Sequence, residues 1–403
     1  MGFKSERVSF YFLVSLILLL TIHIDVMMKM LTGVIFLFMN FSVYSQVDVT
    51  IQIVNAPPSH LSDKIFVAGS FNSWSPNNEN YSFPSAQNGS TSITTKLAKG
   101  IYEYKFTRGD WSKGEATKTG KDIENRFVKI VHDTTISVSI AAWKDDFANS
   151  ITPKKHTASA QVSVLDTAFF IPQLNATRRI WIYLPKGYAN SSQRYPVIYM
   201  HDGQNLFDEF TAGFGEWCVD EFLDSLPSKK ASLIIVGVDN GPKRMAEYNP
   251  YTFRNFGKGE GDSYVAFLAE TLKGFVDAHY RTNPTRKYTI VAGSSMGGLI
   301  SLYAALKYPN VYGGAGIFSP AFWTANGIAS DVKKYAASLK CKLFFYAGAK
   351  ESDEMIPDMQ RIEKEIRTVN PHMPMLEMTD AEAKHNEAAW RHYFPFFYNF
   401  VMP

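Results

Sequence analysis

The sequence contains few cysteines and little net charge, and both features exclude classes of protein. Its two cysteines, Cys218 and Cys341, cannot make a disulfide framework, and neither lies in a CxxC pair of the kind that binds zinc. The 41 basic and 38 acidic side chains give a formal charge of +3. No basic stripe stands out, so a nucleic-acid partner lacks its usual electrostatic basis.

Long apolar runs are also missing. The N-terminal region has two apolar runs, residues 10–24 and 31–41, and both are shorter than the roughly 18 residues of a membrane span. Lys29 precedes the second run and the small residues of Val43-Tyr44-Ser45 follow it, as in a secretory signal. We predict a signal segment over residues 1–45, a secreted or periplasmic location, and no membrane span after its removal. The sequence leaves open whether the two apolar runs form an N-terminal membrane anchor instead, and which codon is the true start.

The composition is that of a globular protein. It is 46% hydrophobic, with 26 glycines and 19 prolines, which excludes collagen-like and disordered classes. At about 100 to 200 residues per domain, 403 residues predict two or three domains.

Residues 46–144 have the pattern of short strands separated by turns, which predicts a small all-β, immunoglobulin-like sandwich of antiparallel strands. Residues 66–74 (FVAGSFNSW) and 102–106 (YEYKF) resemble the early-set sandwich modules related to starch- and glycogen-binding domains. Trp74 and Trp111 could stack on a sugar, because an indole face is flat and apolar. The alternative is that both tryptophans are core or inter-domain packing residues.

Residues 145–160 are polar and are predicted to form a linker. Over residues 161–403, apolar strand-like runs alternate with amphipathic segments, which predicts an α/β fold with a mostly parallel sheet and helices on both faces. In such sheets ligands bind beyond the carboxyl ends of the strands.

One motif lies at such a strand end. Gly293-Ser294-Ser295-Met296-Gly297-Gly298 follows the predicted strand 288–292 and precedes a helix-compatible segment. This is GxSxG in a strand-turn-helix context, where a sharp turn exposes a nucleophilic serine hydroxyl, here Ser295. Ser294 lies inside the turn and is not expected to act.

A serine nucleophile of this kind is followed in the chain by an acid and then a histidine. Three carboxylates follow the predicted strand 342–347, and we favour Glu351 as the residue that orients the histidine, with Asp353 as the alternative. His385 lies in a loop before the last helix and is the predicted base. The predicted oxyanion donors are the backbone amides of Met296 and of Gly203 and Gln204 in the loop after an early strand.

Together with the serine motif, four further motifs make the chain resemble the putative esterase family. They are Tyr183-Leu184-Pro185, His201-Asp202-Gly203-Gln204-Asn205, Ser319-Pro320-Ala321-Phe322-Trp323 and His385-Asn386-Glu387. That family includes esterase D, ferric-siderophore esterases and the feruloyl and acetyl-xylan esterases of carbohydrate esterase family 1. The resemblance covers about residues 180–402. It implies an α/β-hydrolase fold and ester hydrolysis through an acyl-enzyme, with no metal and no cofactor.

The substrate is predicted less directly. Trp323 and Phe322 follow a strand end, and Asn249 and Tyr251 form a similar loop, so these four side chains are candidates to bind substrate, with burial in the core as the alternative. The leading hypothesis is a secreted esterase that removes feruloyl or acetyl groups from plant polysaccharide. The alternatives are a ferric-siderophore esterase of the enterobactin type, and a glycan-binding protein with a non-catalytic hydrolase scaffold.

Overall fold

In the computed structural model, the chain is described over residues 46–402 except for 73, 85–88, 124, 148–153, 228–229 and 254–256. It divides into two compact units, Met1–Gln46 and Val47–Pro403, and nearly all described residues belong to the second. The predicted signal segment and the middle of the predicted linker lie outside the described residues. No helix in the described ranges is both long and apolar enough to cross a membrane.

The first part of the described chain is built from short strands. They are β1 (Gln46–Asn55), β2 (Phe66–Gly69), β3 (Thr91–Ala98), β4 (Gly100–Thr107), β5 (Glu115–Ala116), β6 (Arg126–Ile130), β7 (Thr134–Ser139) and β8 (Ala142–Trp143). Two three-stranded sheets have the orders β3-β1-β7 and β2-β4-β6, and β5 pairs with β8. Alternate residues of β1, such as Ile51, share one buried cluster with Tyr102 and Phe106 of β4, so the two sheets pack face to face.

One pairing in this sandwich differs from the antiparallel arrangement that the strand pattern predicts. β1 and β7 run parallel, with Ile51 opposite Ile136. Parallel neighbours need a long crossover between them, and the intervening strands β2 to β6 supply it.

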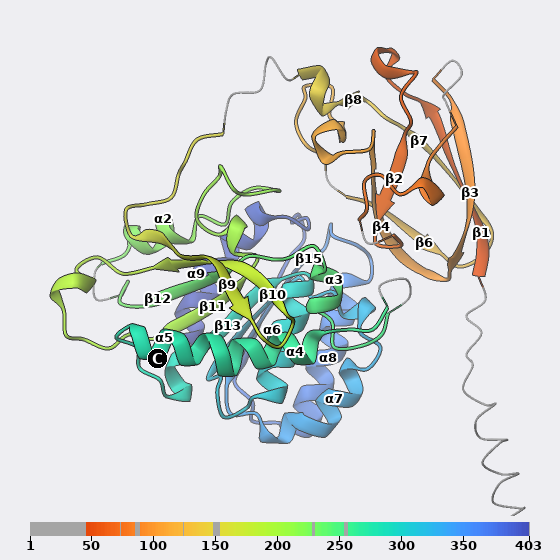
Figure 1. Ribbon diagram of the computed structural model, residues 1–403. Coiled ribbons are helices and arrows are strands. Elements are labelled where there is room, and N and C mark those ends of the chain that lie inside the picture. The colour runs from red at the N-terminus through yellow and green to blue at the C-terminus, as the bar shows by residue number, and fades with distance from the viewer. Residues whose placement is uncertain are drawn as a thin grey trace, which may run out of the picture. The chain divides into compact units, whose positions relative to one another are not determined.

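A single eight-stranded sheet organises the rest of the chain (Figure 1). Its strands are β9 (Val162–Ile171), β10 (Ala176–Tyr183), β11 (Val197–His201), β12 (Ile234–Val238), β13 (Thr289–Ser294), β14 (Gly314–Phe318), β15 (Lys342–Gly348) and β16 (Met375–Asp380). The order is β16-β15-β14-β13-β11-β12-β10-β9. The six strands β11 to β16 are parallel to one another, and β9 and β10 are antiparallel to their neighbours. The sequence pattern did not predict β9, an edge strand with many exposed residues.

Helices cover both faces of this sheet, which confirms the predicted α/β fold (Figure 1). Their bounds are α2 (Val219–Ser225), α3 (Arg244–Glu247), α4 (Gly261–Ala266), α5 (Lys273–His279), α6 (Met296–Lys307), α7 (Ile328–Tyr335), α8 (Met355–Val369) and α9 (Glu387–Val401). A π-helical turn, Phe267–Leu272, joins α4 to α5. Helices α4 to α8 bury residues in the core cluster on one face, and α2 and α9 bury theirs on the other.

The fit between α9 and the sheet is close at one point. A side chain at Gly316 of β14 would clash with α9, because its Cβ would lie 2.6 Å from a ring carbon of Phe397. Phe397 is fully buried, and it also packs against Phe318 and Phe344 at ring-centroid distances of 5.6 and 5.7 Å. The neighbouring Phe396 is 45% exposed.

This pair of adjacent phenylalanines tests the packing. We expect Phe397→Ala to lower the free energy of unfolding by about 3–5 kcal/mol, because it removes a buried ring and leaves a cavity. Phe396→Ala is the matched control and should change it by less than about 0.5 kcal/mol. Urea unfolding of the full chain, followed by circular dichroism, measures both values, and equal losses would show that Phe397 does not hold α9 on the sheet.

Candidate active site

Ser295 occupies the sharp turn between β13 and α6. Its backbone angles are φ +59° and ψ −121°, a region that residues with a side chain adopt rarely. The Ser295 N–H donates to the Phe318 carbonyl at 2.9 Å, and the Ser295 carbonyl accepts from Ala321 N at 3.1 Å. These bonds fix the strained turn against the loop after β14, and the Ser295 side chain stays partly exposed while Ser294 is buried.

The glycines of the motif make room for His201. A Cβ on Gly293 would lie 2.7 Å from Cδ2 of His201, and one on Gly297 would lie 3.3 Å from its Cβ. The His201 ring is buried below the turn, with Nδ1 3.0 Å from the hydroxyl of Tyr264. Burial lowers the pKa of His201 to about 3, so the ring is neutral and serves as packing beneath the serine.

His385 and Glu351 form a hydrogen-bonded pair at the ends of neighbouring strands. His385 Nδ1 lies 2.7 Å from Glu351 Oε2. Oε1 of the same carboxylate accepts from the backbone N–H of Gly348 and from the hydroxyl of Ser319, both at 2.6 Å. Asp353, the alternative acid, is exposed. The structure therefore places Glu351, and not Asp353, beside the histidine.

Ser319 and Trp390 support this pair, and the sequence analysis gave neither a role. Trp390 Nε1 donates to Ser319 Oγ at 2.8 Å, which leaves the Ser319 hydroxyl hydrogen for Glu351. The Trp390 ring also meets the His385 ring edge to face at 5.0 Å. Their positions in the sequence could have identified them, since Ser319 directly follows a strand and Trp390 lies five residues after His385.

The sheet register brings the serine and the pair to one edge. Strands β13, β14, β15 and β16 are consecutive and parallel, so Ser295, Ser319, Glu351 and His385 all follow carboxyl ends of adjacent strands. Backbone bonds connect these ends, because Ser295 N donates to Phe318 O and Ser319 N donates to Tyr346 O at 2.6 Å.

The charge on His385 depends on its partner. Burial of the imidazole disfavours its charged form, but the Glu351 carboxylate and its hydrogen bond outweigh burial, so the pKa of His385 is raised above its usual 6.5. Because Glu351 accepts at Nδ1, that nitrogen carries the hydrogen and Nε2 of the neutral ring carries the lone pair. Nε2 is then the atom that can take a proton.

The predicted oxyanion amides lie in the first turns of two helices. Met296 begins α6, and Gly203 and Gln204 begin the 3-10 turn Gly203–Asn205 after β11. N–H groups in a first turn have no partner within their helix, so they can donate to an anion. Gly203 must be a glycine because a Cβ there would lie 2.8 Å from the backbone of Gly237.

A partly buried ion pair stabilises this turn. Asp202 has a left-handed backbone, with φ +56°, and its carboxylate accepts two bonds from Arg244, at 2.7 and 2.8 Å, and one from Asn240 at 2.7 Å. Burial alone would raise the pKa of Asp202, but Arg244 lowers it, so the carboxylate stays charged. The Asp202 carboxylate oxygens are thereby occupied by these bonds, which gives Asp202 a structural role in the turn. The sequence analysis did not identify Arg244, which lies 42 residues further along the chain.

Two of the four predicted substrate contacts are buried. Phe322 is 2% exposed within the core, and Asn249 is also 2% exposed, with its amide donating to the Thr324 carbonyl at 3.0 Å. These two side chains present little surface to a ligand, which corrects that expectation in favour of packing. Trp323 and Tyr251 remain partly exposed.

Trp74 and Trp111 lie together in the first part of the chain. Both are partly exposed, and their ring centroids are 6.2 Å apart with 45° between the ring planes. Trp74 has φ +56°, an unusual backbone for a tryptophan. Their role in glycan contact stays a prediction.

Parts of the chain are similar to known proteins. The chain is 26% identical over 205 residues to an uncharacterized protein, YbbA, of Bacillus subtilis, which covers 48% of this chain and 76% of that protein. A stretch of 83 residues is 35% identical to part of an alpha-amylase of Niallia circulans, covering 20% of this chain and 6% of that protein. The crystal structure of the BES protein from Bacillus cereus shares the fold at 18% identity and a TM-score of 0.50, over 63% of this chain and 99% of that one.

The family comparison covers the whole site. Residues 171–395, more than half of the chain, match the family described as "Putative esterase". This range contains the strained serine, the acid, the histidine and both helix turns with the predicted oxyanion amides. The chain belongs to this esterase family.

Proposed function

We propose that the protein is a secreted serine esterase that removes feruloyl or acetyl groups from plant polysaccharide through an acyl-enzyme. The observation that carries the proposal is the strained Ser295 at the same sheet edge as the hydrogen-bonded pair of His385 and Glu351. A backbone at positive φ costs on the order of 1–3 kcal/mol, so its presence at a candidate nucleophile calls for a function.

The chemistry follows from the atoms. Ser295 Oγ attacks the ester carbonyl while Nε2 of His385 takes the hydroxyl proton, and the Glu351 carboxylate stabilises the imidazolium. Backbone N–H groups of Met296 and Gly203 or Gln204 donate to the oxyanion. His385 returns the proton to the leaving alkoxide, and the alcohol departs. Water then adds to the acyl-serine by the same route in reverse, releasing the acid and restoring the serine.

The substrate class is supported by three features. Residues 319–341 join β14 to β15 with only short helices, which is too little chain for a bulky lid, so a large polymer can approach the serine. The partly exposed rings of Trp323 and Tyr251 offer an apolar surface for an acyl group. The similarity to part of an alpha-amylase favours a polysaccharide over other ester conjugates.

Replacing the serine tests the nucleophile. We expect Ser295→Ala to lower kcat/KM on methyl ferulate and acetylated xylan by on the order of 10⁴-fold or more, since no other group can form the acyl-enzyme. Ser294→Ala, the neighbouring control, should stay within about fivefold of the wild type. Initial rates of both variants measure this, and more than a few per cent of activity left in Ser295→Ala would rule out the assignment.

The same assay separates the substrate hypotheses. Wild-type turnover should be faster on the feruloyl or acetyl ester than on a ferric catecholate lactone, the siderophore alternative. Faster lactone turnover would replace the polysaccharide assignment. A folded protein that hydrolyses none of the three would overturn both esterase assignments and favour the third hypothesis, a glycan-binding protein on a hydrolase scaffold.

The acid is tested by a pair of isosteric changes. Glu351→Gln removes the charge that stabilises the imidazolium, so kcat should fall on the order of 10³-fold or more. Asp353→Asn changes an exposed carboxylate in the same loop and should leave kcat within about twofold. Steady-state kinetics of the two variants distinguish them, and the reverse order of losses would make Asp353 the acid.

The raised pKa of His385 predicts the pH dependence. Only the neutral imidazole accepts the serine proton, so kcat/KM should fall as the pH drops through the raised pKa, with a midpoint above 6.5. In Glu351→Gln the carboxylate that raises the pKa of His385 is gone, and burial, which lowers that pKa, remains. The midpoint of the pH profile should therefore move to lower pH. The pH profile of kcat/KM for the wild type and for the residual activity of the variant measures both; an unchanged midpoint would contradict the pairing.

A further inference from the structure

Phe214 is an exposed aromatic residue in the loop that joins the 3-10 turn Gly203–Asn205 to α2. It is 68% exposed, more than any other large apolar side chain in the described part of the chain. Single exposed apolar residues are common on protein surfaces, so exposure alone indicates no function. What distinguishes Phe214 is how its loop is held beside the candidate active site.

Asn205, at the end of the turn with two of the predicted oxyanion amides, holds the chain on both sides of Phe214. Its Oδ1 accepts from the Gly213 N–H at 3.0 Å, and its backbone carbonyl accepts from the Trp217 N–H at 2.8 Å. Its Nδ2 donates to Glu387 Oε1 at 3.2 Å. Asn205 is buried, so these bonds are made out of water, where hydrogen bonds are stronger. Phe214 therefore lies at the tip of a short, fixed loop.

The same loop lies against the segment that contains His385. A Cβ on Gly215 would lie 3.7 Å from the Cβ of Glu387, two residues after His385. Trp217 packs against Trp390 at a ring-centroid distance of 5.7 Å, and Trp390 contacts the His385 ring. The loop therefore reaches from the predicted oxyanion amides to the histidine.

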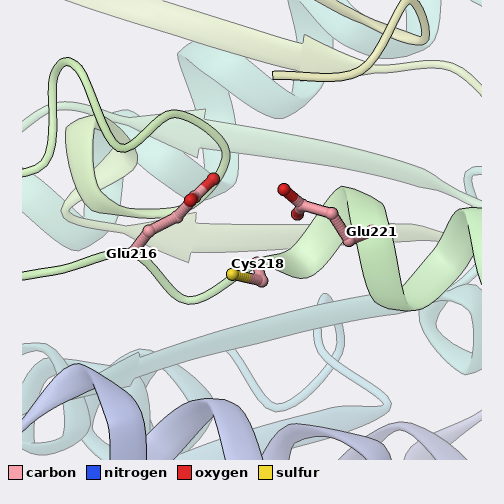
Figure 2. A group of neighbouring side chains, drawn as sticks. All are labelled: Glu216, Cys218 and Glu221. Carbon is pink, nitrogen blue, oxygen red and sulfur yellow. The ribbon is translucent and has the colours of Figure 1, made fainter. Parts of the chain in front are cut away.

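Gly215 turns the chain so that the ring stays on the surface. Its φ is +110°, in the left-handed region that favours glycine, and the next residue, Glu216, is buried. Figure 2 shows the carboxylates of Glu216 and Glu221 directed toward one another across the start of α2. The Glu216 carboxylate also accepts from the Thr157 hydroxyl, which lies 3.1 Å from both of its oxygens. The backbone behind Phe214 is thus fixed, and its ring needs little ordering to bind a ligand.

The direction of proton transfer decides which part of an ester faces this loop. His385 Nε2 gives its proton to the leaving alkoxide, so the alcohol part of a bound ester lies on the histidine side of Ser295. The acyl group stays bonded to the serine when the alcohol departs. In a polysaccharide ester the alcohol is a sugar, and the C–H face of a sugar ring is apolar and packs against a flat aromatic ring.

We propose that Phe214 binds the sugar ring of the leaving alcohol and makes the enzyme prefer sugar esters to esters of small alcohols. This inference rests on the proposed function. The ring has one charged neighbour, the Lys105 ammonium, 5.3 Å from the ring centroid. A cation lies over one face of an aromatic ring, and at 68% exposure most of the residue still meets solvent, which leaves surface for a sugar.

The test compares two esters that share an acyl group and differ in the alcohol. One pair is methyl ferulate and feruloylated arabinose, and the equivalent acetyl pair is methyl acetate and acetylated xylo-oligosaccharide. We expect Phe214→Ala to lower kcat/KM on the sugar ester on the order of tenfold, because it removes the stacking surface. On the methyl ester the change should stay below about twofold, because methanol has no ring to stack.

Phe210→Ala is the matched control. Phe210 lies in the same loop and is 54% exposed, but its ring packs against His156 of the predicted linker at 4.1 Å. This variant should stay within about twofold of the wild type on both esters. Phe214→Tyr keeps a flat ring and should retain the preference for the sugar ester, whereas Phe214→Leu is apolar but not flat and should lose it. Thermal melting followed by circular dichroism shows that each variant is folded.

Equal losses on both esters of a pair in Phe214→Ala would overturn the proposal, because they would place the ring beside the acyl group or indicate a general change in the site. An unchanged preference in Phe214→Ala, or the same loss in Phe210→Ala, would also overturn it. A wild type that hydrolyses the methyl esters and not the sugar esters would leave the serine mechanism standing and remove only the role of Phe214. No turnover of any of the four esters would contradict the proposed function itself, and this inference with it.

Discussion

The candidate site depends on one carboxylate that makes three hydrogen bonds in a buried place. Glu351 accepts from Gly348, Ser319 and His385 at 2.6 to 2.7 Å, and its side chain is 0% exposed. A charge removed from water in this way is tolerated because each bond is made to its ionised form. The same bonds fix the ring of His385 and raise its pKa, so the geometry and the acid-base behaviour of the site have one cause.

Burial has opposite results for the two histidines near the serine. His201 has no charged partner strong enough to offset burial, and it is neutral packing below the glycines of the turn. His385 is largely withdrawn from water too, with its side chain 12% exposed, but its ion-pair partner reverses the effect of burial on the pKa. The role of each ring is therefore set by whether a carboxylate reaches it, and both rings lie at the carboxyl ends of strands or just beyond them.

An ion pair and a pair of stacked rings stabilise the loops at this edge of the sheet. Arg244 donates two hydrogen bonds to the Asp202 carboxylate, and Asp202 has the left-handed backbone that begins the turn of Gly203 and Gln204. Arg244 thereby places positive charge on a carboxylate that the fold has taken out of water. Trp217, in the loop after this turn, packs against Trp390, and Trp390 contacts His385.

The amino-acid sequence by itself determined the α/β alternation, the GxSxG turn and the order of serine, acid and histidine. Local periodicity predicts the alternation, the spacing of the glycines predicts the turn, and the order follows from the positions of the three residues along the chain. It also narrowed the acid to one loop. The tertiary structure places Glu351, and not Asp353, beside His385, because the conformation of the loop after β15 turns the Glu351 side chain inward and leaves Asp353 exposed. It also decided that Phe322 and Asn249 are packing residues, that β1 and β7 run parallel, and that Arg244 and Trp390 support the site. Each of these depends on which distant segments meet, and a pattern confined to neighbouring residues carries no information about that.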